Sequence, residues 1–249
     1  MRVSSTSDWA LSSDAHSATR AACVAAAMAA LLCAAAPARA QGSVGGQLAL
    51  IEREGADRSD PSSAVVYLEA RGRVEQEAAT RPALRQTTIA MTGREFVPHV
   101  RTILAGGSVS FPNKDPFSHN VFSNAEAGPF DLDLYRRGVS KARTFARPGI
   151  YPIYCNIHSR MVSFVIAVPT PYVATVADDG RFMIPDVPAG KYVLHAWHER
   201  AGGSVTREIE VPPGGLAGQH IVLDARAYVA GPHLNKFGLP YAASRADRY

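Results

Sequence analysis

The sequence predicts an all-β protein made of two small β-sandwiches. One reason is that apolar residues almost nowhere recur with helical spacing. Another is that short runs rich in β-branched and aromatic residues recur between turn residues, which is typical of a sandwich or a barrel. These runs fall into two groups that meet at Pro169, so we expect two sandwiches rather than one.

The runs before Pro169 form the first predicted sandwich, over residues 85–169. Turn residues separate the runs, among them Gly128-Pro129 and Pro148-Gly149. Eight short strands in a segment of this length are enough for one Greek-key sandwich. The eight runs are 87–91, 100–105, 108–113, 119–123, 130–135, 141–146, 149–155 and 162–168.

The second predicted sandwich is discontinuous in the chain. After Pro169 the sequence offers five strands, separated by Asp-Gly and Pro-Ala-Gly turns, which make only a thin sandwich. We therefore expect residues 46–70 to pair with residues 172–225, with the first sandwich inserted between them. The alternative is that both early strands extend the first sandwich. The tail, residues 226–249, has no core pattern and is expected to wrap over the surface or to be partly disordered.

Residues 1–40 are predicted to be a secretory signal peptide. Arg20 is followed by sixteen apolar residues and then by an Ala-x-Ala cleavage site that ends at Ala40. This run is too short and too rich in Ala for a good membrane span, which needs about 20 strongly apolar residues. A lipid anchor on Cys33 fits less well, because Leu32 is a poor neighbour for a lipidated Cys. We expect an exported, periplasmic protein without a membrane span.

Charge and cysteine content narrow the function. The chain has 26 Lys and Arg against 22 Asp and Glu and no basic block, which gives no case for nucleic-acid binding. Without the leader, Cys155 is the only Cys and has no internal disulfide partner, so a partner chain or a metal ion must explain it. One basic cluster is expected to be a solvated face or a docking site for an acidic redox partner: Arg136, Arg137, Lys141 and Arg143.

Cys155 begins a segment with three potential metal ligands at equal spacing. In YPIYCNIHSRM, His158 and Met161 follow it at intervals of three residues, after a predicted strand. Thiolate, imidazole and thioether are soft or borderline ligands that favour copper, and two His, one Cys and a weak axial Met compose a blue-copper electron-transfer site. The segment FPNKDPFSHNVFS offers His119 as the second His. Taken singly, each residue has an ordinary interpretation as a buried thiol, a loop His or a gap-filling Met.

The two motifs VSFPNKDPFSHNVFS and PGIYPIYCNIHSRM together resemble the copper-site segments of plastocyanin and amicyanin, in the cupredoxin family. The resemblance covers roughly residues 85–169 and implies a Greek-key cupredoxin sandwich. It implies that Asn120 hydrogen-bonds across to the Cys loop and that four residues bind one copper ion: His119, Cys155, His158 and Met161.

The whole chain resembles plastocyanin-like proteins of the methylamine-utilisation type. In those proteins a carboxypeptidase-regulatory-like sandwich, similar to transthyretin, accompanies the copper domain, and DDGRFMIPDVPAGKYVLHAWHE matches it here. We expect the second sandwich to position the copper domain on a partner or in a larger periplasmic complex. The histidines outside the motifs are expected to be strand, solvent or loop residues: His99, His195, His198, His220 and His233.

We therefore expect a one-electron carrier that exchanges electrons with donor and acceptor proteins through the edge of His158, framed by Pro116, Phe117, Ser159 and Arg160. Copper delivery, sensing or storage is the alternative, and a structural module with a vestigial site is a third. A Cys-His hydrolase would need an orienting group and a helix N-terminus beside the thiol, and neither is visible. Zinc is disfavoured because Met is an unusual zinc ligand. The protein is not expected to be an enzyme.

Overall fold

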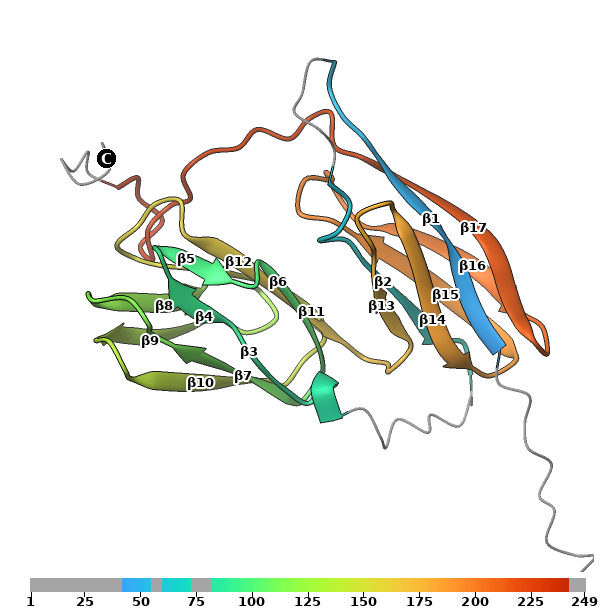
Figure 1. Cartoon of the computed structure of the whole chain (residues 1–249), viewed down its shortest axis with the longest axis horizontal. Helices are drawn as coiled ribbons and strands as arrows, with labels where there is room; N and C mark the ends of the chain where they lie inside the picture. The colour runs from blue at the N-terminus through green and yellow to red at the C-terminus, as the bar shows by residue number, and fades with distance from the viewer. Residues whose placement is uncertain (1–41, 55–59, 73–81, 242–249) are drawn as a thin grey trace, which may run out of the picture. The chain divides into compact units, whose positions relative to one another are not determined.

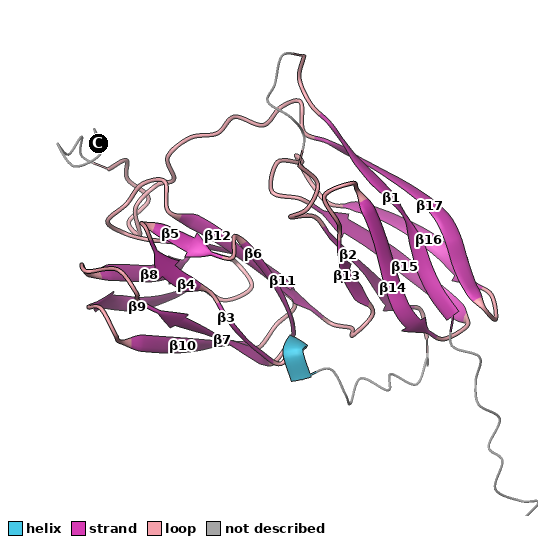
Figure 2. Cartoon of the chain, viewed as in Figure 1, coloured by secondary structure: helices cyan, strands magenta, loops and turns pink. Residues whose placement is uncertain are grey.

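The computed structural model describes residues 42–54, 60–72 and 82–241 of the chain (Figure 1). Over these residues the secondary structure is almost entirely β (Figure 2), with seventeen strands and one short 3-10 helix, η2 (Pro82–Leu84). The prediction of an all-β protein is confirmed. The predicted leader, residues 1–40, lies outside the described residues. In the described part, no helix is long and apolar enough to cross a membrane.

The first sandwich is built from ten consecutive strands: β3 (Gln86–Thr88), β4 (Ala90–Thr92), β5 (Glu95–Val97), β6 (Val100–Leu104), β7 (Gly107–Pro112), β8 (His119–Ser123), β9 (Phe130–Tyr135), β10 (Ser140–Phe145), β11 (Gly149–Tyr154) and β12 (Val162–Val168). A five-stranded sheet has the order β6-β12-β11-β8-β9, and a three-stranded sheet has the order β10-β7-β3. Strands β4 and β5 form a separate hairpin. The sheet edges β6 and β3 pair in parallel with β12 and β7, and the other pairings are antiparallel.

Alternation along these strands directs one face of each sheet into a common core. Val109 and Phe111 of β7 and Tyr151 and Ile153 of β11 are buried at every second position, and all four belong to one cluster of buried side chains. Strand β8 differs, because all five of its residues, HNVFS, are buried. A fully buried strand with polar side chains needs hydrogen-bond partners for them, and these partners define the site described below.

The run predicted as one strand over residues 87–91 is two strands in the structure. Gln86–Thr88 pairs with β7, whereas Ala90–Thr92 pairs with β5, so the chain changes sheets at Ile89. Ile89 is fully buried and its N–H donates to the carbonyl of Ser110. Burial hides this change of sheets from the hydrophobic pattern, because Ile89 is as apolar as a residue within one strand would be. The three-residue strand β5 was not predicted at all.

The second sandwich combines strands from both ends of the described chain: β1 (Gly42–Ile51), β2 (Val65–Ala70), β13 (Val173–Thr175), β14 (Arg181–Val187), β15 (Gly190–Trp197), β16 (Val205–Val211) and β17 (Gly215–Asp224). Its two sheets have the orders β14-β1-β17 and β13-β2-β15-β16. The two early strands thus pair with the late strands, and neither joins a sheet of the first sandwich. The core of this sandwich is a cluster of buried aliphatic and aromatic residues that includes Leu48, Leu68 and Tyr192.

A glycine allows β1 to lie against its parallel neighbour β17. A Cβ atom on Gly46 would collide with the backbone of Gln219 in β17. The register between the two strands shifts between Val44 and Gly46, next to this close approach. Any other residue at Gly46 would push the two strands apart, which is why the sequence GSVGGQ at the start of β1 is rich in glycine.

Candidate metal centre

The predicted ligands come from two neighbouring strands of the five-stranded sheet. His119 is the first residue of β8, and Cys155 directly follows the last residue of β11. The ligand loop, defined here as Cys155–Met161, leads directly into β12. Because β11 pairs with β8 at Tyr154 and Phe122, the end of β11 brings the ligand loop beside β8.

Three of the four predicted ligands converge. The Nδ1 atoms of His119 and His158 each lie 3.7 Å from the Sγ atom of Cys155. The nearest ligand atoms of the three residues all lie within 4.8 Å of one another, and the two imidazole rings are 4.9 Å apart between centroids. His119 and Cys155 are fully buried, whereas His158 is half-buried. The group therefore has one edge near the surface.

These separations fit a small metal ion. With bonds of about 2.0–2.3 Å to nitrogen and sulfur and angles of about 120°, two ligand atoms stand about 3.8 Å apart. The observed 3.7 Å between each Nδ1 and Sγ agrees with this value. One thiolate and two imidazoles suit copper or zinc and do not suit hard ions such as Mg²⁺ or Ca²⁺.

Met161, the fourth predicted ligand, is 1% exposed and belongs to the same buried cluster as Cys155. Its backbone closes the ligand loop. The N–H of Cys155 donates to the carbonyl of Met161 at 3.3 Å, and the N–H of Met161 donates to the carbonyl of His158 at 3.0 Å. These bonds hold the backbone of Met161 close to that of Cys155 and His158. The role of Met161 as an axial ligand stays a prediction.

Asp115 sets the orientation of the His119 ring. The Nε2 atom of His119 lies 2.7 Å from Oδ2 of Asp115, and both side chains are buried. A carboxylate acceptor holds the ring proton on Nε2, which leaves the lone pair of Nδ1 directed at Cys155. Burial alone would raise the pKa of Asp115, but hydrogen bonds from backbone amides and from His119 outweigh it, so the pKa is lowered and the carboxylate stays charged.

The short hairpin β4–β5 provides those amides. Its turn residues, Gly93 and Arg94, both have positive φ angles, of 65° and 64°. This conformation directs two successive N–H groups at the same carboxylate, at 2.6 Å and 2.9 Å from the Asp115 oxygens. A hairpin that the sequence pattern did not predict therefore supports His119, the first predicted ligand, through one intermediate residue.

Two asparagines connect the elements around the site. The amide of Asn113 donates to the carbonyls of Phe117 and Tyr135, and its oxygen accepts from the N–H of Asp115. The oxygen of Asn120 accepts from the N–H of Asn156 in the ligand loop at 3.3 Å. The amide of Asn120 also donates to Asp131 of β9 at 2.6 Å. The structure thus forms the bond across to the Cys loop that the resemblance implied for Asn120.

The environment of the Cys155 sulfur favours a ligand over a nucleophile. Burial raises the pKa of the Cys155 thiol, and backbone hydrogen bonds from Asn120 of β8 and from Ile157 and His158 of the loop only partly offset this rise. A reactive Cys needs a lowered pKa in a partly exposed position, which is the opposite arrangement. A bound metal ion, in contrast, displaces the thiol proton directly.

Phe117 covers the surface edge of the site. Its ring lies 5.1 Å from that of His119 and 5.8 Å from that of His158, and 36% of the residue is exposed. Phe164, although it lies in the strand that follows the ligand loop, does not line the site. It packs against Trp197 at 5.1 Å and joins a different cluster of buried residues, because its side chain lies on the other face of β12 from Val165.

The sequence reasoning missed two groups of residues around the site. Asp115 lies inside a quoted motif, four residues before His119, and that spacing is the signal that could have identified it. The other group lies in the predicted tail. His233, expected to be a solvent or loop residue, stacks on Tyr154 with 4.4 Å between ring centroids, and Tyr241 donates to the carbonyl of Cys155.

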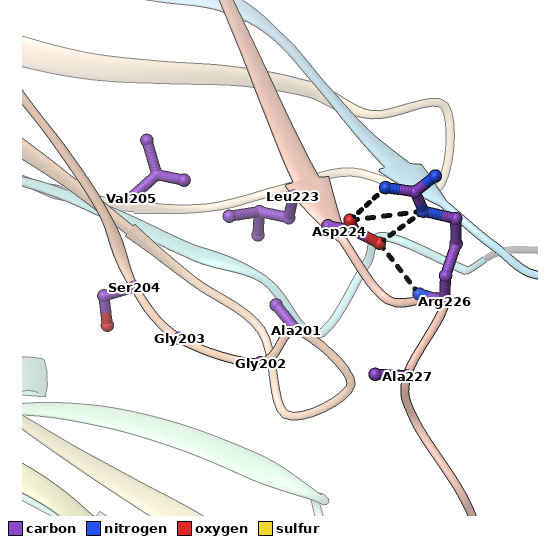
Figure 3. Close-up of a pocket in the computed structure, with 9 residues that line it drawn as sticks. All are labelled: Ala201, Gly202, Gly203, Ser204, Val205, Leu223, Asp224, Arg226 and Ala227. Atoms are coloured by element: carbon purple, nitrogen blue, oxygen red, sulfur yellow. Dashed lines mark hydrogen bonds and ion pairs between the residues drawn. The ribbon is translucent and has the colours of Figure 1, made fainter.

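A hollow in the second sandwich is lined mainly by small side chains between Ala201 and Val205 and by the end of β17 (Figure 3). Its charged residues, Asp224 and Arg226, are mostly exposed and hydrogen-bond to each other, at 2.6 Å for the closest pair. Both charges are therefore already paired in open solvent, and the hollow offers no comparable set of ligand atoms.

Comparison with known proteins assigns the chain to a family, although no known protein-family profile matches it. Plastocyanin from Ulva prolifera is 34% identical over 73 residues, which cover 26% of this chain and 74% of that protein. Plastocyanin from Ulva arasakii is 30% identical over the same shares. The chain belongs to the cupredoxin family. Within that family, its matched segment is of the plastocyanin type, as the two motifs implied.

Several solved structures align with between 33% and 49% of the chain. The purple cupredoxin from Nitrosopumilus maritimus has 23% identity and a TM-score of 0.30, and it aligns with 33% of this chain and 99% of its own. Amicyanin from Paracoccus versutus has 23% identity and a TM-score of 0.32, over 41% of this chain and 98% of its own. A copper-containing nitrite reductase from Thermus scotoductus has 24% identity and a TM-score of 0.33, over 49% of this chain and 28% of its own.

Proposed function

We propose that this protein is an exported, mononuclear type 1 copper protein that carries one electron at a time between protein partners. The observation that carries the proposal is the buried group of His119, Cys155 and His158, with both Nδ1 atoms 3.7 Å from the same sulfur. Two imidazoles and one thiolate, with Met161 as a weak axial ligand, match the donor set of blue-copper sites. Copper bound there would supply a single redox centre that alternates between Cu(II) and Cu(I).

The chain's own residues would make electron exchange fast by holding the ligand positions fixed. His119 is held through Asp115, and the ligand loop is closed by its own backbone bonds and tied to β8 by Asn120. Ligands that hardly move between oxidation states keep the reorganisation energy small. This rigidity favours electron transfer over delivery or storage, because a delivery site must open to release its ion.

Electrons would enter and leave through the half-buried edge of His158. Phe117, which contacts both imidazoles and is 36% exposed, and Ile157, which is 43% exposed, give this edge an apolar surface. A donor and an acceptor protein would dock there in turn. In this role the protein consumes no substrate and is a carrier rather than an enzyme, and its place is the periplasm, where the leader over residues 1–40 would direct it.

The test is to titrate the reduced mature chain with Cu(II) and to record its absorption, its electron paramagnetic resonance spectrum and its voltammetry. We expect one equivalent of copper, an intense thiolate-to-copper band in the red region, narrow copper hyperfine splitting and a reversible one-electron wave. Bound copper with a faint band and no reversible wave would contradict the electron-carrier role and favour delivery or storage. No bound copper would overturn the metal centre itself.

A further inference from the structure

The chain returns to the ligand loop after the second sandwich ends. Beyond β17, residues 228–241 form an extended segment without secondary structure that ends at the first sandwich (Figure 1). This segment, called the strap below, belongs to the tail that was expected to wrap over the surface or to be partly disordered, and the structure places it on the ligand loop. It makes few backbone bonds of its own, among them the bonds between Asn235 and Gly238 or Leu239.

The strap bonds to four of the seven residues of the ligand loop. The hydroxyl of Tyr241 donates to the carbonyl of Cys155 at 2.7 Å, and the N–H of Lys236 donates to the side-chain oxygen of Asn156 at 2.9 Å. The N–H of His233 donates to the carbonyl of Ser159 at 2.9 Å, and its Nε2 lies 3.3 Å from the carbonyl of His158. Two of these four loop residues are predicted metal ligands.

Ring packing and one ion pair hold the strap in place. The ring of His233 stacks on Tyr154, which directly precedes Cys155, and the ring of Tyr241 meets His233 edge-on at 5.3 Å. Lys236 pairs with Asp131 at 2.6 Å, and the same carboxylate accepts from Asn120. The strap is thus connected to both strands that carry ligands, β8 through Asp131 and Asn120 and β11 through Tyr154.

Apart from the strap, the ligand loop is held by its two closing backbone bonds, by Asn120 and by backbone bonds to the Cys155 sulfur on its inner side. The carbonyls of Cys155 and Ser159 point away from those bonds and accept from Tyr241 and His233 instead. A short loop that is held at its ends and not on its outer side opens readily, because local opening costs little where few bonds and contacts oppose it. The bonds from the strap supply that outer side.

We propose that residues 228–241 are part of the metal centre and hold the ligand loop in its metal-binding conformation, with Tyr241 and His233 as positioning residues. The strap keeps the Cys155 and His158 backbone in place whether or not a metal is bound. It therefore raises metal affinity by removing the cost of ordering the loop, in the way that preorganisation raises the affinity of any binding site. The inference rests on the proposed function only for the statement that the loop binds copper.

The first test needs no metal. Hydrogen–deuterium exchange of the amides of residues 155–161 is compared in the copper-free mature chain, in Tyr241→Phe and in His233→Ala. We expect exchange to be about fivefold faster in each variant and faster still in the double variant, because each loses a bond to the loop. Tyr192→Phe is the matched control, since that hydroxyl also donates to a backbone carbonyl, of Pro188 at 2.8 Å, but in the second sandwich. It should leave loop exchange unchanged.

The second test measures Cu(II) affinity and the thiolate-to-copper band of the same five proteins. We expect affinity to fall in the two strap variants by about the factor by which exchange rises, and to stay unchanged in Tyr192→Phe. Unchanged loop exchange in the double variant would overturn the proposal that the strap holds the ligand loop, even if the wild type binds copper with an intense band. Faster loop exchange in the strap variants than in the wild type, together with a wild type that takes up no copper, would support the role of the strap and overturn the electron-carrier function, so the two failures are distinguishable.

Discussion

The two sandwiches have cores of equal size and different chemistry. Each core cluster contains sixteen buried residues, but the cluster of the second sandwich is made only of aliphatic and aromatic side chains, whereas the cluster of the first includes Met91, Cys155 and Met161. Of the eight buried polar or charged residues in the described part, six lie in the first sandwich, and four of those fall between Asn113 and Asn120.

The difference separates what folding needs from what function needs. Burying polar groups costs free energy unless each one is hydrogen-bonded, so a core that only has to be stable contains few of them, as in the second sandwich. The first sandwich buries Asp115 and His119 together and provides each with partners. A buried polar network that stability does not require marks the part of the molecule that carries the chemistry.

The largest expected effect is the loss of the thiolate in Cys155→Ser. The Cu(II) affinity should fall by more than about 100-fold, and the intense red-region band should disappear, because that band needs a copper–sulfur bond. Absorption during a copper titration measures both. An intense band that survives the substitution would show that the metal lies elsewhere, and the comparison between the two cores would then lose its basis.

Leu68→Ala should lower the stability of the fold without changing the metal centre. Leu68 is fully buried in the second core, so its truncation should lower the free energy of unfolding by about 2–5 kcal/mol and leave the copper spectrum unchanged. Ile153→Ala is the matched change in the first core, on the strand that leads to Cys155, and should alter both. Denaturant unfolding and visible absorption report the two effects. A changed spectrum in Leu68→Ala would contradict the separation.

Met161→Leu tests the fourth ligand. Leu has a similar volume, so the fold should be kept within about 1.5 kcal/mol. Loss of a thioether donor destabilises the more highly charged oxidised ion, so the reduction potential should rise by about 100 mV while the thiolate band remains. Voltammetry measures the shift. If neither the potential nor the spectrum changes, Met161 is an ordinary core residue.

Asp115→Asn removes a buried negative charge next to His119 without a large change in shape. A carboxylate there stabilises Cu(II) over Cu(I), so the variant's reduction potential should rise by about 40–120 mV. Asp179→Asn, on an exposed turn of the second sandwich, is the control and should leave the potential unchanged. Equal potentials for Asp115→Asn and the wild type would mean that the buried network serves only folding.

The smallest expected effect is a pH dependence of the strap. Burial raises the pKa of Asp131, but hydrogen bonds from Lys236 and Asn120 outweigh this, so the folded-state pKa lies below the ordinary 3.8. The ion pair therefore stabilises the strap fully above pH 3.8 and is lost as the pH falls through the lowered pKa. Because both side chains are 30% exposed, the effect should be about 0.2–1 kcal/mol. Hydrogen exchange of the ligand loop measures it, and Asp131→Asn should flatten the profile.

Much of this architecture could be predicted from local pattern. Strands such as β8, β9 and β12 appear as β-rich runs with the predicted bounds, and two motifs were enough to identify His119, Cys155 and His158 as a set. Strand periodicity and ligand spacing are properties of short segments. The resemblance to cupredoxins, carried by those same segments, is confirmed.

The features that were missed depend on contacts between distant segments. The bond from Tyr241 to Cys155 joins residues 86 positions apart, and the pair of Lys236 and Asp131 spans 105. No periodicity encodes such a contact, because the strap has no regular structure and its residues are ordinary for a loop. The sheet change at Ile89 was hidden for a different reason, since a buried apolar residue fits either sheet.

The discontinuity of the second sandwich also sets an order of assembly. The strands β3–β12 are continuous in the chain, so all strands of the first sandwich are available once Val168 has emerged. Strand β1 must wait for its parallel partner β17, whose register begins at Gly215, and pairings at such separation form slowly. Tyr241 comes later still. The strap can therefore reach the ligand loop only after the strands of both sandwiches have been made, and a chain truncated before His233 would lack the bonds that we propose secure that loop.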